Sequence, residues 1–72
     1  MFVEIEDFKT GWFGVSIGLK NDEIEQLIER LRLLHNGSSS HFHLTNNNGE
    51  AGGIYDIEIY VSENDSHNMK IM

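Results

Sequence analysis

The most informative stretch of the sequence is Ser39 to Tyr60, where two segments alternate between apolar and polar residues. Residues 41–45 read HFHLT, and residues 54–61 read IYDIEIYV. Successive side chains of a strand point to opposite faces, so each segment has one apolar and one polar side. Residues 46–53, rich in Asn and Gly, separate the segments and predict a flexible connection of the kind that often carries binding. We therefore expect a hairpin with one apolar and one polar face.

The polar face of this expected hairpin combines imidazole, carboxylate and phenol groups. Its members are His41, His43, Asp56, Glu58 and Tyr60. Two imidazoles on one strand face bind a transition metal when a carboxylate completes the ligand set. The same side chains also form hydrogen bonds across a sheet or contacts in an interface. Because His-x-His arises easily in strands, we favour the structural or interface role, and we predict no metal, no cofactor and no thermal stabilisation by a divalent ion.

Two more alternating segments come earlier in the chain. Residues 2–8 read FVEIEDF and residues 12–19 read WFGVSIGL, with a Lys-Thr-Gly turn between them. One side of the second segment is nearly bare, because it carries Gly14, Ser16 and Gly18 beside Trp12. A glycine within a strand often marks the close approach of another group. We therefore expect Trp12 to lie across Gly14 or to contact a partner there.

An amphipathic helix follows these strands. Asn21 is a suitable N-cap, and Asp22 and Glu23 place negative charge in the first turn, where the helix dipole favours it. The Asn36-Gly37 pair predicts the C-terminal end, about four turns later. Apolar residues recur at spacings of three and four and form one stripe: Ile24, Leu27, Ile28, Leu31 and Leu34.

These elements predict one α+β domain spanning residues 1–72, in the order β-β-α-β-β. The helix is expected to pack on one face of a small, mainly antiparallel sheet. Residues 62–72 form either a frayed tail or a short fifth strand at the sheet edge. Twelve apolar residues from all five elements are expected to form one core: Val3, Ile5, Phe13, Val15, Ile17, Leu27, Ile28, Leu31, Phe42, Leu44, Ile57 and Ile59.

Size and charge narrow the classes of function. The chain has 72 residues and no cysteine, so it has neither a disulfide framework nor a thiolate zinc site, and we expect a homodimer to supplement its small core. Twelve acidic against five basic side chains give a net charge of −7, which disfavours nucleic acid and favours a basic protein partner. The sequence shows neither a secretory start nor an apolar run of membrane-spanning length, and we expect a cytoplasmic protein without membrane contact.

Catalytic motifs are weak in this sequence. The serines lack a G-x-S-x-G context, and the glycines at 49, 52 and 53 lack the spacing of a phosphate-binding loop. One helix on one small sheet also offers little room for the concave pocket that acid-base chemistry by Asp56 and Glu58 requires. We therefore expect a protein that is not an enzyme.

The order of features from Ile24 to Gly53 resembles the immunity protein 32 family of bacterial polymorphic toxin systems. The features are an amphipathic helix ending near Leu33-Leu34, the segment HFHL at 41–44, and a polar loop with Gly52-Gly53. The resemblance implies a cytoplasmic, non-enzymatic protein that neutralises a cognate toxin by binding it.

The acidic composition and the exposed aromatic residues agree with binding to a basic protein such as a toxin. The candidate partner-binding residues are Trp12, His41, His43, Asp56, Glu58 and Tyr60. Two other interpretations remain open. One is a homo-oligomeric structural or regulatory domain, and the other is a metal-binding domain that uses His41 and His43.

Overall fold

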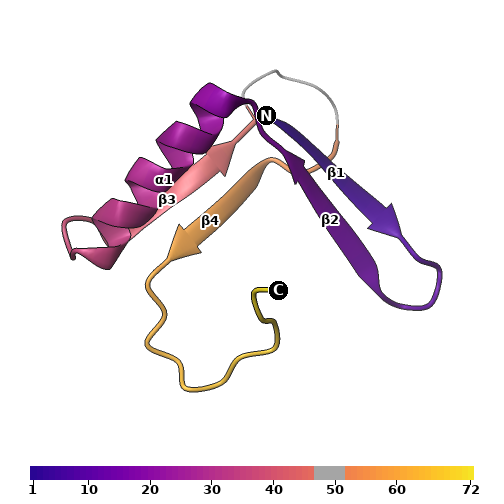
Figure 1. The fold of residues 1–72 in the computed structure, drawn as a ribbon. Coiled ribbons are helices and arrows are strands. Elements are labelled where there is room, and N and C mark those ends of the chain that lie inside the picture. The colour runs from indigo at the N-terminus through magenta and orange to yellow at the C-terminus, as the bar shows by residue number, and fades with distance from the viewer. Residues whose placement is uncertain (47–51) are drawn as a thin grey trace.

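The computed structural model describes residues 1–46 and 52–72 and contains four strands and one helix in these ranges (Figure 1). Their order is β1 (Phe2–Asp7), β2 (Phe13–Gly18), α1 (Asn21–His35), β3 (His41–Thr45) and β4 (Asp56–Tyr60). The predicted α+β class and the order β-β-α-β-β are confirmed. The expectation of a flexible connection falls largely on residues 47–51, which lie outside the described residues.

The N-terminal strands form an antiparallel two-stranded sheet. Its register places Val3 opposite Ile17 and Ile5 opposite Val15, so the branched side chains gather on one face. The turn between β1 and β2 has Lys9 and Gly11 at φ values of 59° and 92°. The backbone N–H of Lys9 donates to Asp7 Oδ1 at 2.8 Å, which is the local side-chain contact that favours such turns.

The C-terminal strands form a second, separate antiparallel sheet. Phe42 pairs with Ile59 and Leu44 with Ile57, and all four are half-buried on one face. Helix α1 lies alongside β3 and covers this face of the sheet (Figure 1). The result is a small helix-on-hairpin layer, which is the arrangement that an apolar sheet face requires.

Local signals in the sequence set both ends of α1. The N-cap is Lys20, one residue before the predicted Asn21, and the Lys20 backbone N–H donates to Glu23 Oε1 at 3.1 Å. Glu23 also accepts a short hydrogen bond from the terminal ammonium of Met1. At the other end Gly37 has a φ of 81°, the left-handed conformation in which glycine closes many helices. Both predicted helix boundaries are therefore accurate to about one residue.

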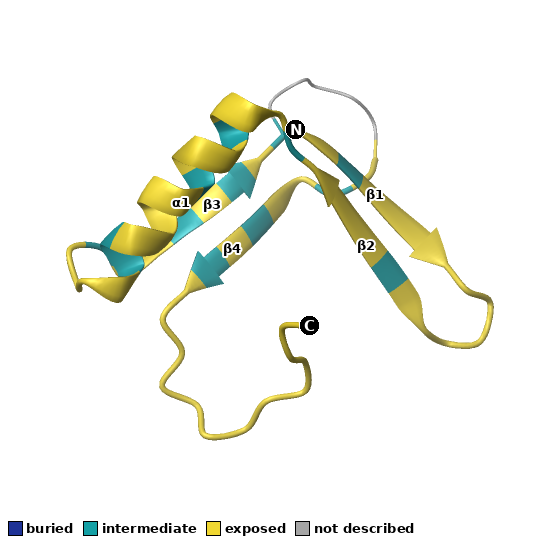
Figure 2. Cartoon of the chain, in the orientation of Figure 1, coloured by how far each residue is buried: buried dark blue, intermediate teal, exposed yellow. Residues whose placement is uncertain are grey.

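The predicted single core is wrong for the chain on its own, because no described residue is fully buried (Figure 2). Helix α1 lies alongside β3, whereas the β1–β2 hairpin diverges from this layer (Figure 1). Six of the twelve predicted core residues are half-buried: Val3, Leu27, Phe42, Leu44, Ile57 and Ile59. The other six are exposed by 43 to 63%: Ile5, Phe13, Val15, Ile17, Ile28 and Leu31.

Two measures show how open the chain is. Its accessible surface is 6,823 Å². A compact monomer of 8.3 kDa exposes about 4,600 Å². The radius of gyration is 14.2 Å, against about 11 Å for a compact domain of this length. The chain therefore presents more surface than a self-sufficient domain of its size.

The C-terminal residues 61–72 contain neither helix nor strand, so this segment adds no fifth strand to the sheet edge. Met69, Ile71 and Met72 in this tail are almost fully exposed. Within the residues that the structure describes, there is no helix of the length and hydrophobicity that crossing a bilayer demands.

Candidate functional site

The polar face of the β3–β4 hairpin is the candidate functional site. The register pairs His41 with Tyr60, His43 with Glu58 and Thr45 with Asp56, so these side chains leave one face of the sheet. All of them are exposed, because α1 covers only the opposite face. The structure thus brings together five of the six predicted contact residues.

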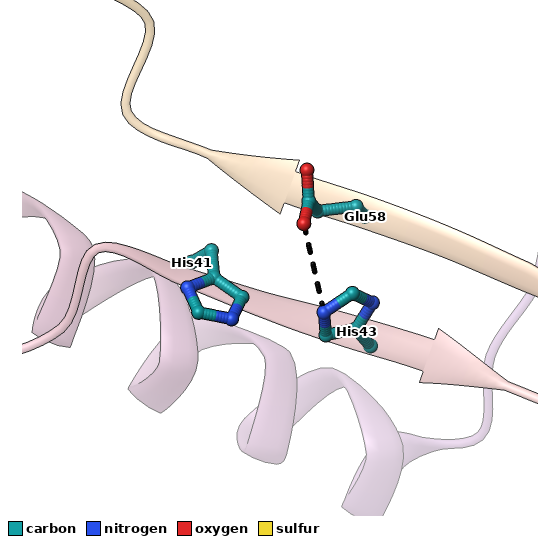
Figure 3. Close-up of side chains that lie close together, drawn as sticks. All are labelled: His41, His43 and Glu58. Atoms are coloured by element: carbon teal, nitrogen blue, oxygen red, sulfur yellow. Dashed lines mark ion pairs between the residues drawn. The ribbon is translucent and has the colours of Figure 1, made fainter.

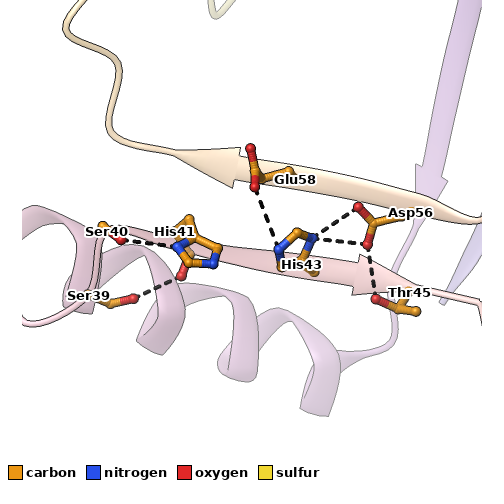
Figure 4. A network of polar contacts seen from close by, with 7 residues as sticks. All are labelled: Ser39, Ser40, His41, His43, Thr45, Asp56 and Glu58. Carbon is orange, nitrogen blue, oxygen red and sulfur yellow. Dashed lines mark hydrogen bonds and ion pairs between the residues drawn. The ribbon is translucent and has the colours of Figure 1, made fainter.

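His43 is the centre of a network of polar contacts on this face (Figure 4). Its Nδ1 lies 3.0 Å from both carboxylate oxygens of Asp56. Because an ionised carboxylate only accepts hydrogen bonds, Nδ1 carries the proton and donates it. Thr45 Oγ1 donates to Asp56 Oδ1 at 3.1 Å and so helps to hold the carboxylate against the ring. On the other side of the ring, His43 Nε2 lies 3.6 Å from Glu58 Oε2.

His41 has a similar local partner. Its Nδ1 lies 3.0 Å from Ser40 Oγ, and Ser39 Oγ donates to the His41 carbonyl oxygen at 2.8 Å. The rings of His41 and His43 meet edge to face, with centroids 5.2 Å apart and an interplanar angle of 87°. Ligand atoms of His41, His43 and Glu58 all lie within 4.8 Å of one another (Figure 3). The two imidazoles and the carboxylate therefore face one small region of space.

Trp12 does not belong to this face. It immediately precedes β2 in the other sheet, and 77% of its surface is exposed. Phe8, rather than Trp12, lies over Gly14, because a Cβ built on Gly14 would meet Phe8 Cζ at 2.7 Å. The prediction that Trp12 crosses Gly14 is therefore wrong, and contact with a partner is the alternative that remains for Trp12.

The position of Phe8 follows from the register of the first sheet. Gly14 pairs with Glu6, and Phe8 comes two residues after Glu6, so its side chain leaves the same face and reaches the diagonal position. The sequence did contain this signal, because Phe8 lies as far before the turn as Trp12 lies after it. Alternation alone does not distinguish the two rings.

Sequence reasoning also missed Ser39 and Ser40 as site residues. They directly precede β3, where a serine hydroxyl commonly bonds to a neighbouring group of its own segment. Both hydroxyls contact His41 and fix its backbone and ring. The predicted hydrogen bonding of the histidines across the sheet is confirmed for the pair His43 and Asp56.

The arrangement can hold positive charge. Two carboxylates flank an imidazole on an open surface, and the side chains of His43, Asp56 and Glu58 are 41, 37 and 48% exposed. A basic side chain or a metal ion therefore reaches them without a change in the backbone. An open hollow of about 250 Å³ lies beside this face, between α1 and β3. It is smaller than an ordinary small-molecule pocket.

Comparison of the chain with protein-family models, with curated proteins and with solved structures found no match.

Proposed function

We propose that the protein is a non-enzymatic binding protein that holds a basic protein partner on the polar face of β3–β4. The observation that supports this proposal is the exposed pair Asp56 and Glu58 on either side of His43, fixed in register by the strand pairing. A toxin-neutralising or inhibitory protein is the form of this function that the resemblance to immunity proteins favours.

The charges suit attraction of a basic surface. Asp56 and Glu58 are two residues apart on one strand and point to the same side, so they present two carboxylates about 7 Å apart. The net charge of −7 adds a long-range attraction for a cationic partner. Such charges mainly accelerate association, and their effect falls as salt rises.

Exposed aromatic residues supply the second component of an interface. Tyr60 lies opposite His41 on the same face and is 59% exposed. Tyrosine and tryptophan are enriched among the residues that contribute most binding energy, because they bury a large area at low entropic cost. In this proposal Tyr60 is the anchor on the polar face, and Trp12 is a second contact from the other hairpin.

The proposal is tested by capture of a partner from the native host, followed by binding kinetics. Glu58→Lys is expected to slow association several-fold and to weaken its salt dependence, whereas Tyr60→Ala mainly speeds dissociation. Glu25→Lys, the same charge change on the exposed side of α1, is the matched control. A captured partner whose kinetics are the same for Glu58→Lys and Glu25→Lys, and which ignores Tyr60→Ala, would refute the proposal.

A second candidate function is self-assembly as a homodimer, and the excess exposed surface favours it. The chain exposes about 2,200 Å² more than a compact monomer of its mass. Obligate homodimers bury about 2,000–5,000 Å² over both chains, or about 1,000–2,500 Å² for each. One interface between two copies therefore suffices to cover the excess.

The chain carries two exposed apolar surfaces that fit a reciprocal contact. One is the β1–β2 face with Ile5, Val15 and Ile17, and the other is the uncovered flank of α1 with Ile24, Ile28 and Leu31. In a two-fold dimer the first surface of each copy covers the second surface of the other. Sedimentation over a range of concentrations tests this: a weight-average mass rising towards twice that of the chain supports the dimer, and a constant monomer mass refutes it.

A further inference from the structure

We propose that His41, His43 and Glu58 form a binding site for a transition-metal dication such as Zn²⁺. One ligand atom of each residue lies within 4.8 Å of the others (Figure 3). Zinc takes His nitrogen and carboxylate oxygen at about 2.0–2.2 Å, so tetrahedral ligand atoms are separated by roughly 3.4 Å. The ligand atoms must therefore approach one another by at most about 1.4 Å, which rotation of exposed side chains can supply while the strand pairing fixes the backbone.

The hydrogen bonds around the two histidines have the pattern of a metal site. Ligating histidines usually donate the second ring N–H to a carboxylate or another oxygen, which fixes the tautomer and raises the basicity of the ligating nitrogen. His43 Nδ1 contacts Asp56, and His41 Nδ1 contacts Ser40 Oγ, each at 3.0 Å. The Nε2 atom of each ring is thereby directed to the side where the metal would bind, and Figure 4 shows that of His41 turned towards His43.

The supporting contacts extend one step further at His43. Thr45 Oγ1 donates to Asp56 Oδ1 at 3.1 Å, so the carboxylate that orients the ring is itself held. Strand pairing supports the same set, because His43 stands directly opposite Glu58 and His41 lies two residues earlier on the same face. In a metal site the ligands are oriented by hydrogen-bonded partners that are themselves held in place, and this support distinguishes such a site from a chance group of exposed side chains.

The ligand set determines the class of metal. Two imidazole nitrogens and one carboxylate oxygen suit Zn²⁺, Ni²⁺, Cu²⁺ or Fe²⁺, whereas Mg²⁺ and Ca²⁺ prefer oxygen ligands alone. Three protein ligands leave a fourth position for water or for a group of another molecule. The site requires no protein partner, so it can be tested separately from the function proposed above, although both use Glu58 and His43. It also departs from our expectation from sequence, in which His-x-His carried no metal.

Titration calorimetry with Zn²⁺ on chelator-treated protein is the direct test. We expect saturable binding of one ion per chain and a melting temperature that rises with zinc concentration, because a ligand of the native state stabilises it by mass action. His43→Ala is expected to lower the affinity by at least about tenfold. Asp56→Asn, which leaves all three ligands in place, is expected to cost about 10- to 100-fold through the loss of the orienting carboxylate. Mg²⁺ is expected to have no effect at the same concentration.

His67→Ala is the matched control, since His67 is an exposed histidine in the C-terminal tail outside the cluster. It is expected to keep the zinc affinity and stoichiometry of the original chain. His41→Ala serves as a second ligand variant, and circular dichroism verifies that each variant keeps its secondary structure. Equal zinc affinity in His43→Ala, His41→Ala and His67→Ala would overturn the site, as would the absence of saturable binding in the unaltered protein.

Discussion

The two hairpins of this protein have similar lengths and the same alternation but very different surroundings. Hairpin β3–β4 has its apolar face covered by α1, and each of the four residues on that face is half-buried. On hairpin β1–β2 the corresponding face remains open, with Ile5, Val15 and Ile17 exposed by 54, 58 and 43%. An isolated two-stranded hairpin is marginal in water unless another layer covers it. Alternation therefore specifies which face of a hairpin needs covering but not which element covers it.

The difference also explains where the candidate site lies. A polar side chain is placed reproducibly only where the strand that carries it is held on its other face. Because α1 packs against the β3–β4 hairpin, both strand pairing and packing fix the hydrogen bonds that link Thr45, Asp56 and His43. On β1–β2 the strands are paired, yet packing within the described chain contributes little to their position. A partner on this hairpin would thus supply stability, whereas one on the polar face would use a surface already formed.

The first prediction concerns the exposed apolar face of β1–β2 and dimerisation. Val15→Lys places a charge on the apolar face of β1–β2 and is expected to weaken the proposed homodimer by about a hundredfold or more, because an unpaired charge in an interface is costly. Ser16→Lys is the matched control: it adds the same charge to the opposite face, directly across from Glu4. Sedimentation should show monomer for Val15→Lys and dimer for Ser16→Lys. Equal dimerisation of both variants would exclude this hairpin from the interface.

The next prediction compares how the same substitution, isoleucine to alanine, changes stability in the two hairpins. Ile57→Ala removes a half-buried side chain beneath α1 and is expected to cost about 1–2 kcal/mol, below the 2–5 kcal/mol of fully buried sites. Ile17→Ala, on the open face, is expected to cost under about 1 kcal/mol at dilutions where the chain is monomeric. Urea denaturation of both variants measures the difference. A cost for Ile17→Ala equal to that of Ile57→Ala in the monomer would show that β1–β2 has an intramolecular cover.

A smaller effect tests the packing of Phe8 over Gly14. Gly14→Ala would place a Cβ 2.7 Å from Phe8 Cζ, and the exposed ring can swing away at a cost of less than about 1 kcal/mol. The cost should disappear in the Phe8→Ala background, which a double-mutant cycle measures. Gly18→Ala is the control in the same strand, because its nearest contact is an ordinary 3.6 Å to the Phe2 carbonyl oxygen. A coupling energy of zero between positions 8 and 14 would contradict this packing.

Much of the local structure was predictable from the sequence. Period-two alternation located all four strands, and the alternating segment that begins at His41 coincides with β3. The helix ends followed from Asp22, Glu23 and Gly37, because local charges and backbone conformations determine them. The polar face was predictable for the same reason, since strand pairing alone brings His43 next to Glu58.

Tertiary relationships were less predictable. A stripe from Ile24 to Leu34 suggested that the whole apolar side of α1 is covered, but Leu27 and Leu34 are half-buried whereas Ile24, Ile28 and Leu31 remain 40 to 50% exposed. Periodicity indicates that a surface is apolar, but either another element of the same chain or a second chain can cover that surface. The division into two sheets has no signature in the pattern of any one strand. The orienting roles of Ser40 and Asp56 depend on ring positions that alternation does not specify.

The last prediction concerns the pH dependence of stability and the carboxyl of Glu23 at the start of α1. The terminal ammonium of Met1 donates a hydrogen bond to Glu23, and with the Lys20 backbone N–H it lowers the pKa of this carboxyl below its ordinary value of 4.5. A lowered folded-state pKa means that the carboxylate stabilises the fold above pH 4.5 and that this contribution is lost as the pH falls through the lowered value. Glu23→Gln should therefore reduce stability at neutral pH slightly and make it less dependent on pH below 4.5. Glu25→Gln, two residues further on the exposed side of α1, is the control and should retain the pH dependence of the original chain. Denaturation midpoints measured from pH 3 to 7 test the contact, and the same acid loss in Glu23→Gln as in the original chain would assign that loss to other carboxylates.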